Sequence, residues 1–87
     1  MMHAGRIETS NRLKGVLAFL AGRGQRGATT IEIADALRTT NPGRDVSEIN
    51  HNFRRSGIGR KIVCEYEGAT DSGRRIWRYR LLEEMAA

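Results

Sequence analysis

The sequence predicts a single α+β domain of three short helices followed by a β-hairpin. Apolar residues recur at helical spacing in the first two-thirds of the chain, and glycine or proline interrupts that pattern at short intervals. Polar and apolar residues alternate in the last third, as in strands with one buried face. The chain has 87 residues, of which 39% are hydrophobic and 29% charged, as expected for one globular domain. We therefore expect a domain over 10–82, a flexible N-terminus over 1–9 and a frayed tail over 83–87.

The first helix is expected to begin at Ser10 or Asn11, because both residue types are favoured N-caps. Its apolar residues follow the i, i+3, i+4, i+7 spacing of a buried stripe. That stripe consists of Leu13, Val16, Leu17 and Leu20. Gly22, Gly24 and Gly27 then end the helix and form a link to the next element.

A second helix is expected after Ala28 and Thr29, which have room only for a minimal third strand. Thr29 and Glu32 have the spacing of a capping box, and Thr30 is a competing N-cap. The apolar side of this helix comprises Ile31, Ile33, Ala34 and Leu37. We expect the helix to end near Arg38.

The third helix is predicted to begin at Pro42, because Asn41 is a favoured N-cap and proline is favoured at the first helical position. Three apolar residues form its predicted buried stripe: Val46, Ile49 and Phe53. Gly57 suits the left-handed position that ends a helix.

The last third predicts strands at 61–67 and 75–82, joined by a polar turn at 68–73. The alternation predicts that six residues face the core: Ile62, Cys64, Tyr66, Trp77, Tyr79 and Leu81. We interpret Cys64 as a buried structural thiol and the aromatic residues as core rather than base-stacking side chains. This order of elements predicts a winged helix-turn-helix, with the two- or three-stranded hairpin as the wing.

The net charge is +5, and the basic residues are 13 arginines and 2 lysines. Arginine binds phosphates and guanine edges through its planar fork, which favours a nucleic-acid partner, although a GC-rich genome explains the excess equally well. Residues 28–57 carry four basic and four acidic side chains, so the prediction depends on geometry more than on total charge. One cysteine, and the lack of a signal-like or membrane-length apolar run, lead us to expect a cytoplasmic protein without membrane association.

The predicted binding surface combines the outer face of the third helix with the hairpin tip. At about 100° per residue, the side opposite the buried stripe is polar and mainly basic. The predicted DNA-binding residues are Arg44, Ser47, His51, Arg54 and Arg55 on the helix, with Arg74 and Arg75 at the tip. Arg44 lies in the first turn, where contacts to base edges concentrate. Glu48 on the same face opposes binding unless it accepts from cytosine or orients Arg44 or Arg55, and the competing interpretation is a solvated polar face.

Other basic residues have separate interpretations. Arg78 and Arg80 are expected to pair across the sheet with Glu65 and Glu67. A second set is expected to add nonspecific phosphate contacts and comprises Arg12, Lys14, Arg23 and Arg26.

Catalytic and metal-binding patterns are not found in the sequence. The GxxxxGK[ST] and GxGxxG motifs are missing, and neither His3 nor His51 has metal-ligand partners at suitable spacing. We therefore expect no metal, no cofactor and no catalytic residues, and hence no enzyme.

A family resemblance is carried by three segments, TTIEIADAL, NPGRDVSEINHNFRRSGIGRKIVCEYEG and RRIWRYRL. They contain a T-T-x-E-I helix start at 29–33, a V-S-E-I segment leading to F-R-x-x-G at 46–57, and R-Y-R-L at 78–81. In these features the chain resembles the small winged helix-turn-helix proteins of phages and prophages. The resemblance implies a sequence-specific double-stranded DNA-binding protein that regulates transcription in a phage or mobile element, with a homodimer or host-protein partner as a further option. The alternatives are a protein-interaction module, an excisionase-like recombination factor and an RNA-binding protein.

Overall fold

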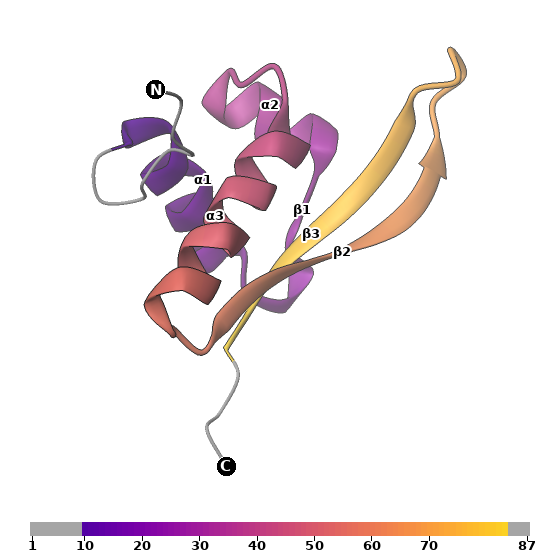
Figure 1. Ribbon diagram of the computed structural model, residues 1–87. Helices are drawn as coiled ribbons and strands as arrows, with labels where there is room; N and C mark the ends of the chain where they lie inside the picture. The colour runs from indigo at the N-terminus through magenta and orange to yellow at the C-terminus, as the bar shows by residue number, and fades with distance from the viewer. Residues whose placement is uncertain (1–9, 84–87) are drawn as a thin grey trace.

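The computed structural model describes residues 10–83, which form helices packed against a three-stranded antiparallel sheet (Figure 1). The elements are α1 (Asn11–Arg23), the 3₁₀ turn η2 (Gly24–Arg26), β1 (Ala28–Thr29), α2 (Thr30–Leu37), α3 (Pro42–Ser56), β2 (Arg60–Ala69) and β3 (Arg75–Glu83). This arrangement confirms the predicted α+β class and is compatible with a winged helix. The predicted flexible segment 1–9 and most of the predicted tail lie outside the described residues.

The helix boundaries follow from local capping. Ser10, Thr29 and Asn41 are the N-caps, and each side-chain oxygen accepts from the backbone N–H three residues later. In α2 the capping box is complete, because the Glu32 carboxylate accepts from the Thr29 N–H at 2.9 Å. Gly57 ends α3 in the left-handed conformation, with φ at 67°. The predicted helix starts and the end of α3 are therefore confirmed.

The core lies between the three helices and one face of the sheet. Its fully or nearly buried apolar residues are Leu13, Val16, Leu20, Ala28, Ile33, Val46, Ile49, Phe53, Ile62 and Tyr79. The buried stripes predicted for the first and third helices supply most of this set, with Leu17 partly buried beside them. No helix within residues 10–83 has the length and apolar character needed to cross a bilayer.

The sheet has the order β1-β3-β2, which makes β3 the central strand and leaves β2 at an edge. Thr30 extends the short pairing of β1, since its hydroxyl accepts from the Trp77 N–H at 3.2 Å and lies 3.3 Å from the Trp77 carbonyl. A bulge interrupts the β2–β3 register between Tyr66 and Gly68. The strands are longer than predicted and the turn is shorter, so Glu83 belongs to β3 and not to a tail.

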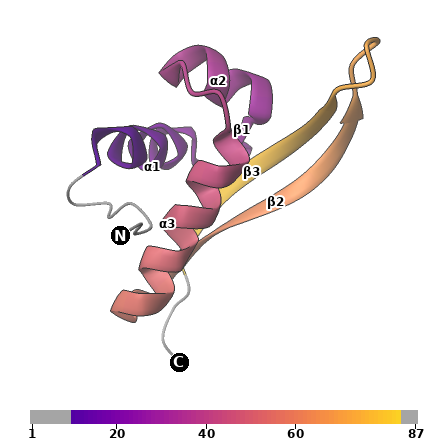
Figure 2. The same cartoon turned by 45° about the horizontal axis from the view of Figure 1, so that its top comes forward.

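The outer half of the hairpin projects past the helices (Figures 1 and 2). For this reason two predictions were wrong: Cys64 is exposed, and Tyr66 is 54% exposed. Both alternate with Ile62 on the inner side, but only Ile62 is covered. Tyr66 instead packs edge-on against the half-buried Trp77, with 5.2 Å between ring centroids. Tyr79 lies in the core as predicted, and its burial raises the pKa of its phenol.

Gly27 brings the link after α1 into direct contact with β3. Its φ is 62°, and a Cβ atom there would lie 2.1 Å from the Tyr79 carbonyl oxygen. Only glycine accommodates both the positive φ and this close approach. The backbone of the link can therefore reach the side chains of β3.

Candidate functional site

The third helix turns one side to the core and the other to solvent. Two contacts border the exposed face. Glu48 of α3 contacts Arg12 of α1, and Asn50 of α3 contacts the backbone of Ile62 in β2. Five predicted binding residues occupy this face and are all exposed: Arg44, Ser47, His51, Arg54 and Arg55. Within residues 10–83 their side chains form neither ion pairs nor hydrogen bonds, so their donors are available to a partner.

The hairpin tip is an ordered turn that carries two more available arginines. The Thr70 N–H donates to the Arg74 carbonyl at 2.8 Å, and the Arg74 N–H donates to the Thr70 hydroxyl at 3.1 Å. These bonds engage only the backbone of Arg74. The side chains of Arg74 and Arg75 are exposed and have no acidic partner in the described part of the chain, although Asp71 lies in the same turn.

An ion-pair cluster joins α1 to the flank of α3. Arg12 Nε lies 2.9 Å from Asp45 Oδ1, and Arg12 Nη2 lies 3.0 Å from Glu48 Oε2. Asp45 is fully buried, and its other oxygen accepts from the Thr39 hydroxyl at 2.6 Å. Glu48 is therefore paired with Arg12 and not with Arg44 or Arg55. Arg12, which the sequence assigned to phosphate contacts, is already engaged inside the protein.

Asn50 connects the same helix to the hairpin. Its Nδ2 donates to the Ile62 carbonyl at 2.9 Å, and its Oδ1 accepts from the Ile62 N–H at 2.7 Å. This side chain occupies the place that a further strand would take at the edge of β2. The sequence analysis missed it, and the available signal was a polar residue beside the apolar stripe of α3.

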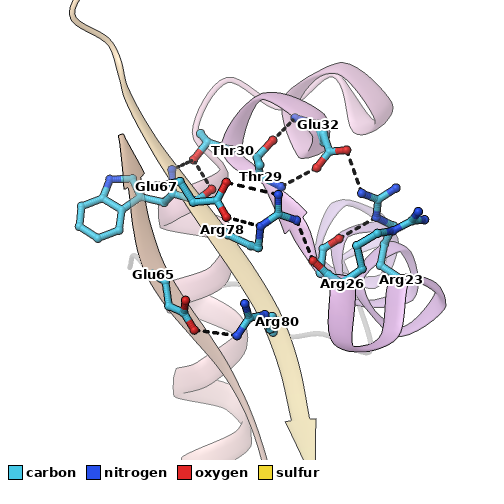
Figure 3. A network of polar contacts seen from close by, with 11 residues as sticks. Arg23, Arg26, Thr29, Thr30, Glu32, Glu65, Glu67, Arg78 and Arg80 are labelled. Carbon is cyan, nitrogen blue, oxygen red and sulfur yellow. Dashed lines mark hydrogen bonds and ion pairs between the residues drawn. The ribbon is translucent and has the colours of Figure 1, made fainter. Parts of the chain in front are cut away.

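The face of the hairpin that points away from the core, here called the rear face, carries paired arginines (Figure 3). Arg78 forms a two-point contact with the Glu67 carboxylate and also donates to the Arg26 carbonyl at 2.7 Å. Arg80 Nη1 lies 2.6 Å from Glu65 Oε1. The predicted cross-strand pairing is confirmed. The hydrogen bond from Arg78 is the main cause of a lowered pKa at Glu67.

Arg23 is also paired and lies beside the start of α2 (Figure 3). Arg23 Nε donates to the Gly27 carbonyl at 2.7 Å, and Arg23 Nη2 lies 2.8 Å from Glu32 Oε2. The backbone hydrogen bond from Thr29, followed by the charge of Arg23, lowers the pKa of Glu32. Arg23 is thus also engaged, so two members of the predicted nonspecific phosphate-binding set are held in ion pairs.

Taken by region, the arginines fall into two classes. Arg78 and Arg80 on the sheet, Arg23 at the end of α1, Arg12 at the α1–α3 contact and Arg60 at the start of β2 have carboxylate partners. The arginines on the exposed face of α3 and at the tip have none within residues 10–83, and neither do Arg26 and Arg38. No group of three His, Cys, Asp or Glu side chains suited to a metal occurs in that range. Comparison of the chain with protein-family models, curated proteins and solved structures found no match. What the surface binds must therefore be inferred from its own chemistry.

Proposed function

We propose that this chain is a winged helix-turn-helix protein that binds double-stranded DNA sequence-specifically and catalyses no reaction. In this proposal α3 enters the major groove, and Arg74 and Arg75 contact the flanking backbone or minor groove. The observation that supports this proposal is that the arginines on the exposed face of α3 and at the tip have no carboxylate partner within residues 10–83. By contrast, Arg78 and Arg80 on the hairpin are each paired with a glutamate.

Unpaired guanidinium groups on the exposed face of a helix have the chemistry that duplex recognition needs. Arginine donates two parallel hydrogen bonds to the N7 and O6 of guanine, and each such contact gives about 1–3 kcal/mol of discrimination. Arg44 lies in the first turn of α3 and is assigned to base edges, together with Ser47 and His51. Arg54 and Arg55 in the last turn are assigned to phosphates. The proposed role is cytoplasmic control of transcription in a phage or mobile element, as the family resemblance implies.

A salt titration tests the mode of binding. The affinity for a random-sequence duplex is measured by fluorescence anisotropy over a range of salt concentrations. If about four arginines neutralise phosphates, log K should fall with log salt at a slope of about −3.6. Weak binding without salt dependence would contradict DNA binding and favour a protein-docking module, and preferential competition by duplex RNA would assign the surface to RNA.

A pair of charge-matched variants tests the division of the arginines. A preferred sequence is first selected from a random pool, and Arg44→Gln is then compared with Arg80→Gln, which removes the same charge from a paired position. Arg44→Gln should lower the affinity for the preferred sequence about tenfold or more and relax its selectivity. Arg80→Gln should leave both near the wild-type values. Equal losses in the two variants would show that net charge, and not the exposed face of α3, drives binding.

A further inference from the structure

A basic pocket lies where the end of α3 meets the start of β2. It has a volume of about 280 Å³ and is lined by Asn50, Arg54, Ile58, Arg60 and Lys61. The strand register places Arg60 opposite Glu83, whereas Ala69 is opposite Arg75. The pocket is therefore at the base of the hairpin, and Arg74 and Arg75 are at the opposite end of the hairpin.

The pocket has an excess of positive charge. Three of its five lining residues are basic. Arg54 is exposed, and its side chain has no partner among the described residues. Arg60 Nη2 lies 3.2 Å from Glu83 Oε1, but the Glu83 side chain is 72% exposed, so water screens this pair. A compact anion entering the pocket would meet guanidinium donors without having to displace a buried carboxylate.

We propose that this pocket binds one backbone phosphate of the DNA duplex, an inference that rests on the proposed function. Arginine holds a phosphate through two parallel N–H donors, and a lysine ammonium adds a point charge beside it. Ile58 is 47% exposed and gives the pocket an apolar wall against which a deoxyribose can pack. A phosphodiester flanked by sugars matches this combination of positive charge and apolar surface.

The spacing along the hairpin separates this contact from that of the tip. The nine residues of β3 span roughly 30 Å at about 3.3 Å per residue. One turn of B-DNA advances by about 34 Å. In this proposal a separation of that size makes the pocket and the tip contact different backbone segments of the duplex.

Phosphate-ethylation interference tests this inference. The selected duplex is ethylated at random phosphates, and bound and free fractions are compared for the wild type, for the pocket variants Arg54→Gln and Lys61→Gln, and for the tip variant Arg75→Gln. Arg80→Gln is the charge-matched control, and circular dichroism verifies that each variant is folded. The wild type should show two clusters of interfering phosphates. Each pocket variant should lose one cluster and reduce the salt slope by about 0.9, while Arg75→Gln should lose the other.

The outcomes separate the two proposals. Retention of both clusters by the folded pocket variants would overturn the phosphate pocket while leaving DNA binding intact. If the same variants instead lost binding to an acidic peptide, the pocket would be assigned to a protein partner. A wild-type protein that binds no duplex at any salt concentration would overturn the proposed function and the pocket together.

Discussion

The exposed face of α3 and the rear face of the hairpin both carry arginines, but those on α3 are unpaired and those on the hairpin are paired with carboxylates. On the rear, Arg78 and Arg80 each contact a carboxylate of the neighbouring strand. On α3, Arg44 and Arg55 are solvated and have no partner within residues 10–83. The comparison teaches that arginine content alone does not locate a polyanion surface. The proposed surface is instead defined by the unpaired guanidinium groups that lie together on α3 and at the hairpin tip.

The two regions also differ in how they contribute to folding. Exposed ion pairs contribute about 0–1 kcal/mol each, so the rear face depends mainly on the close contacts that position it. The exposed residues of α3 contribute little, because their side chains contact solvent. Substitutions should consequently change stability where elements pack together and binding on the exposed face of α3. Three stability experiments sharpen this comparison.

The largest effect is expected for Gly27→Ala in the link between α1 and β1. The added Cβ would clash with the Tyr79 carbonyl, and the φ of 62° is strained for alanine. We expect a loss of at least about 3 kcal/mol in the free energy of unfolding, measured by urea denaturation. Gly22→Ala is the matched control, since a Cβ there meets nothing within 4 Å, and it should stabilise α1 by about 0.5–1 kcal/mol. Similar midpoints for the two variants would show that the link is not tightly packed against β3.

An intermediate effect is expected for Asn50→Ala, which removes the side-chain hydrogen bonds that connect α3 to β2. The Ile62 N–H and carbonyl would both lose their partner. Leaving a partly buried polar group unsatisfied costs about 1–3 kcal/mol, which thermal or urea unfolding would detect. Ser47→Ala on the exposed face of the same helix is the control and should remain within about 0.5 kcal/mol of the wild type. A loss no larger than that of the control would mean that solvent replaces Asn50 without cost.

The smallest effect is expected from acid titration of Glu32. Its pKa in the folded protein is lowered from the ordinary value of 4.5, so the unfolded chain takes up the proton at higher pH. Its stabilising contribution is therefore present above about pH 4.5 and is lost as the pH falls through the folded-state pKa. Because the side chain is 41% exposed, we expect the contribution to be about 1 kcal/mol or less.

The test is urea denaturation of the wild type and Glu32→Gln from neutral pH to about pH 2. The difference in unfolding free energy between them should shrink as the pH falls. Asp35→Asn controls for the loss of one exposed carboxylate from the same helix. A difference that stays constant across the whole range would contradict the role assigned to the ionised Glu32.

Some features could be predicted because they depend on residues close together in the chain. The capping box of Thr29 with Glu32 and the start of α3 at Asn41-Pro42 are formed by groups within one helical turn. Burial along the hairpin could not be predicted in the same way. Alternation assigned Cys64 and Tyr66 to the inner side, but whether that side is covered depends on how far the helices extend beneath the strands.

The candidate site shows the same limit. The exposure of Arg44 and Arg55 followed from helical geometry, because the apolar stripe of α3 defines its opposite side. The pairing of Arg12 with Asp45 and Glu48, and the contact of Asn50 with Ile62, join elements that only folding brings together. No periodic pattern in the sequence indicates either contact.

By itself, the sequence determined where helices begin, which helical faces are apolar and which segments alternate as strands, because these properties depend on neighbouring residues and on backbone periodicity. The tertiary structure alone decided which arginines are neutralised and which part of the hairpin is covered. The physical reason is that ion pairing and burial depend on separation in space. Arg78 reaches the Arg26 carbonyl 52 positions away, while the side chain of Arg75, three residues earlier, contacts no carboxylate in the described range.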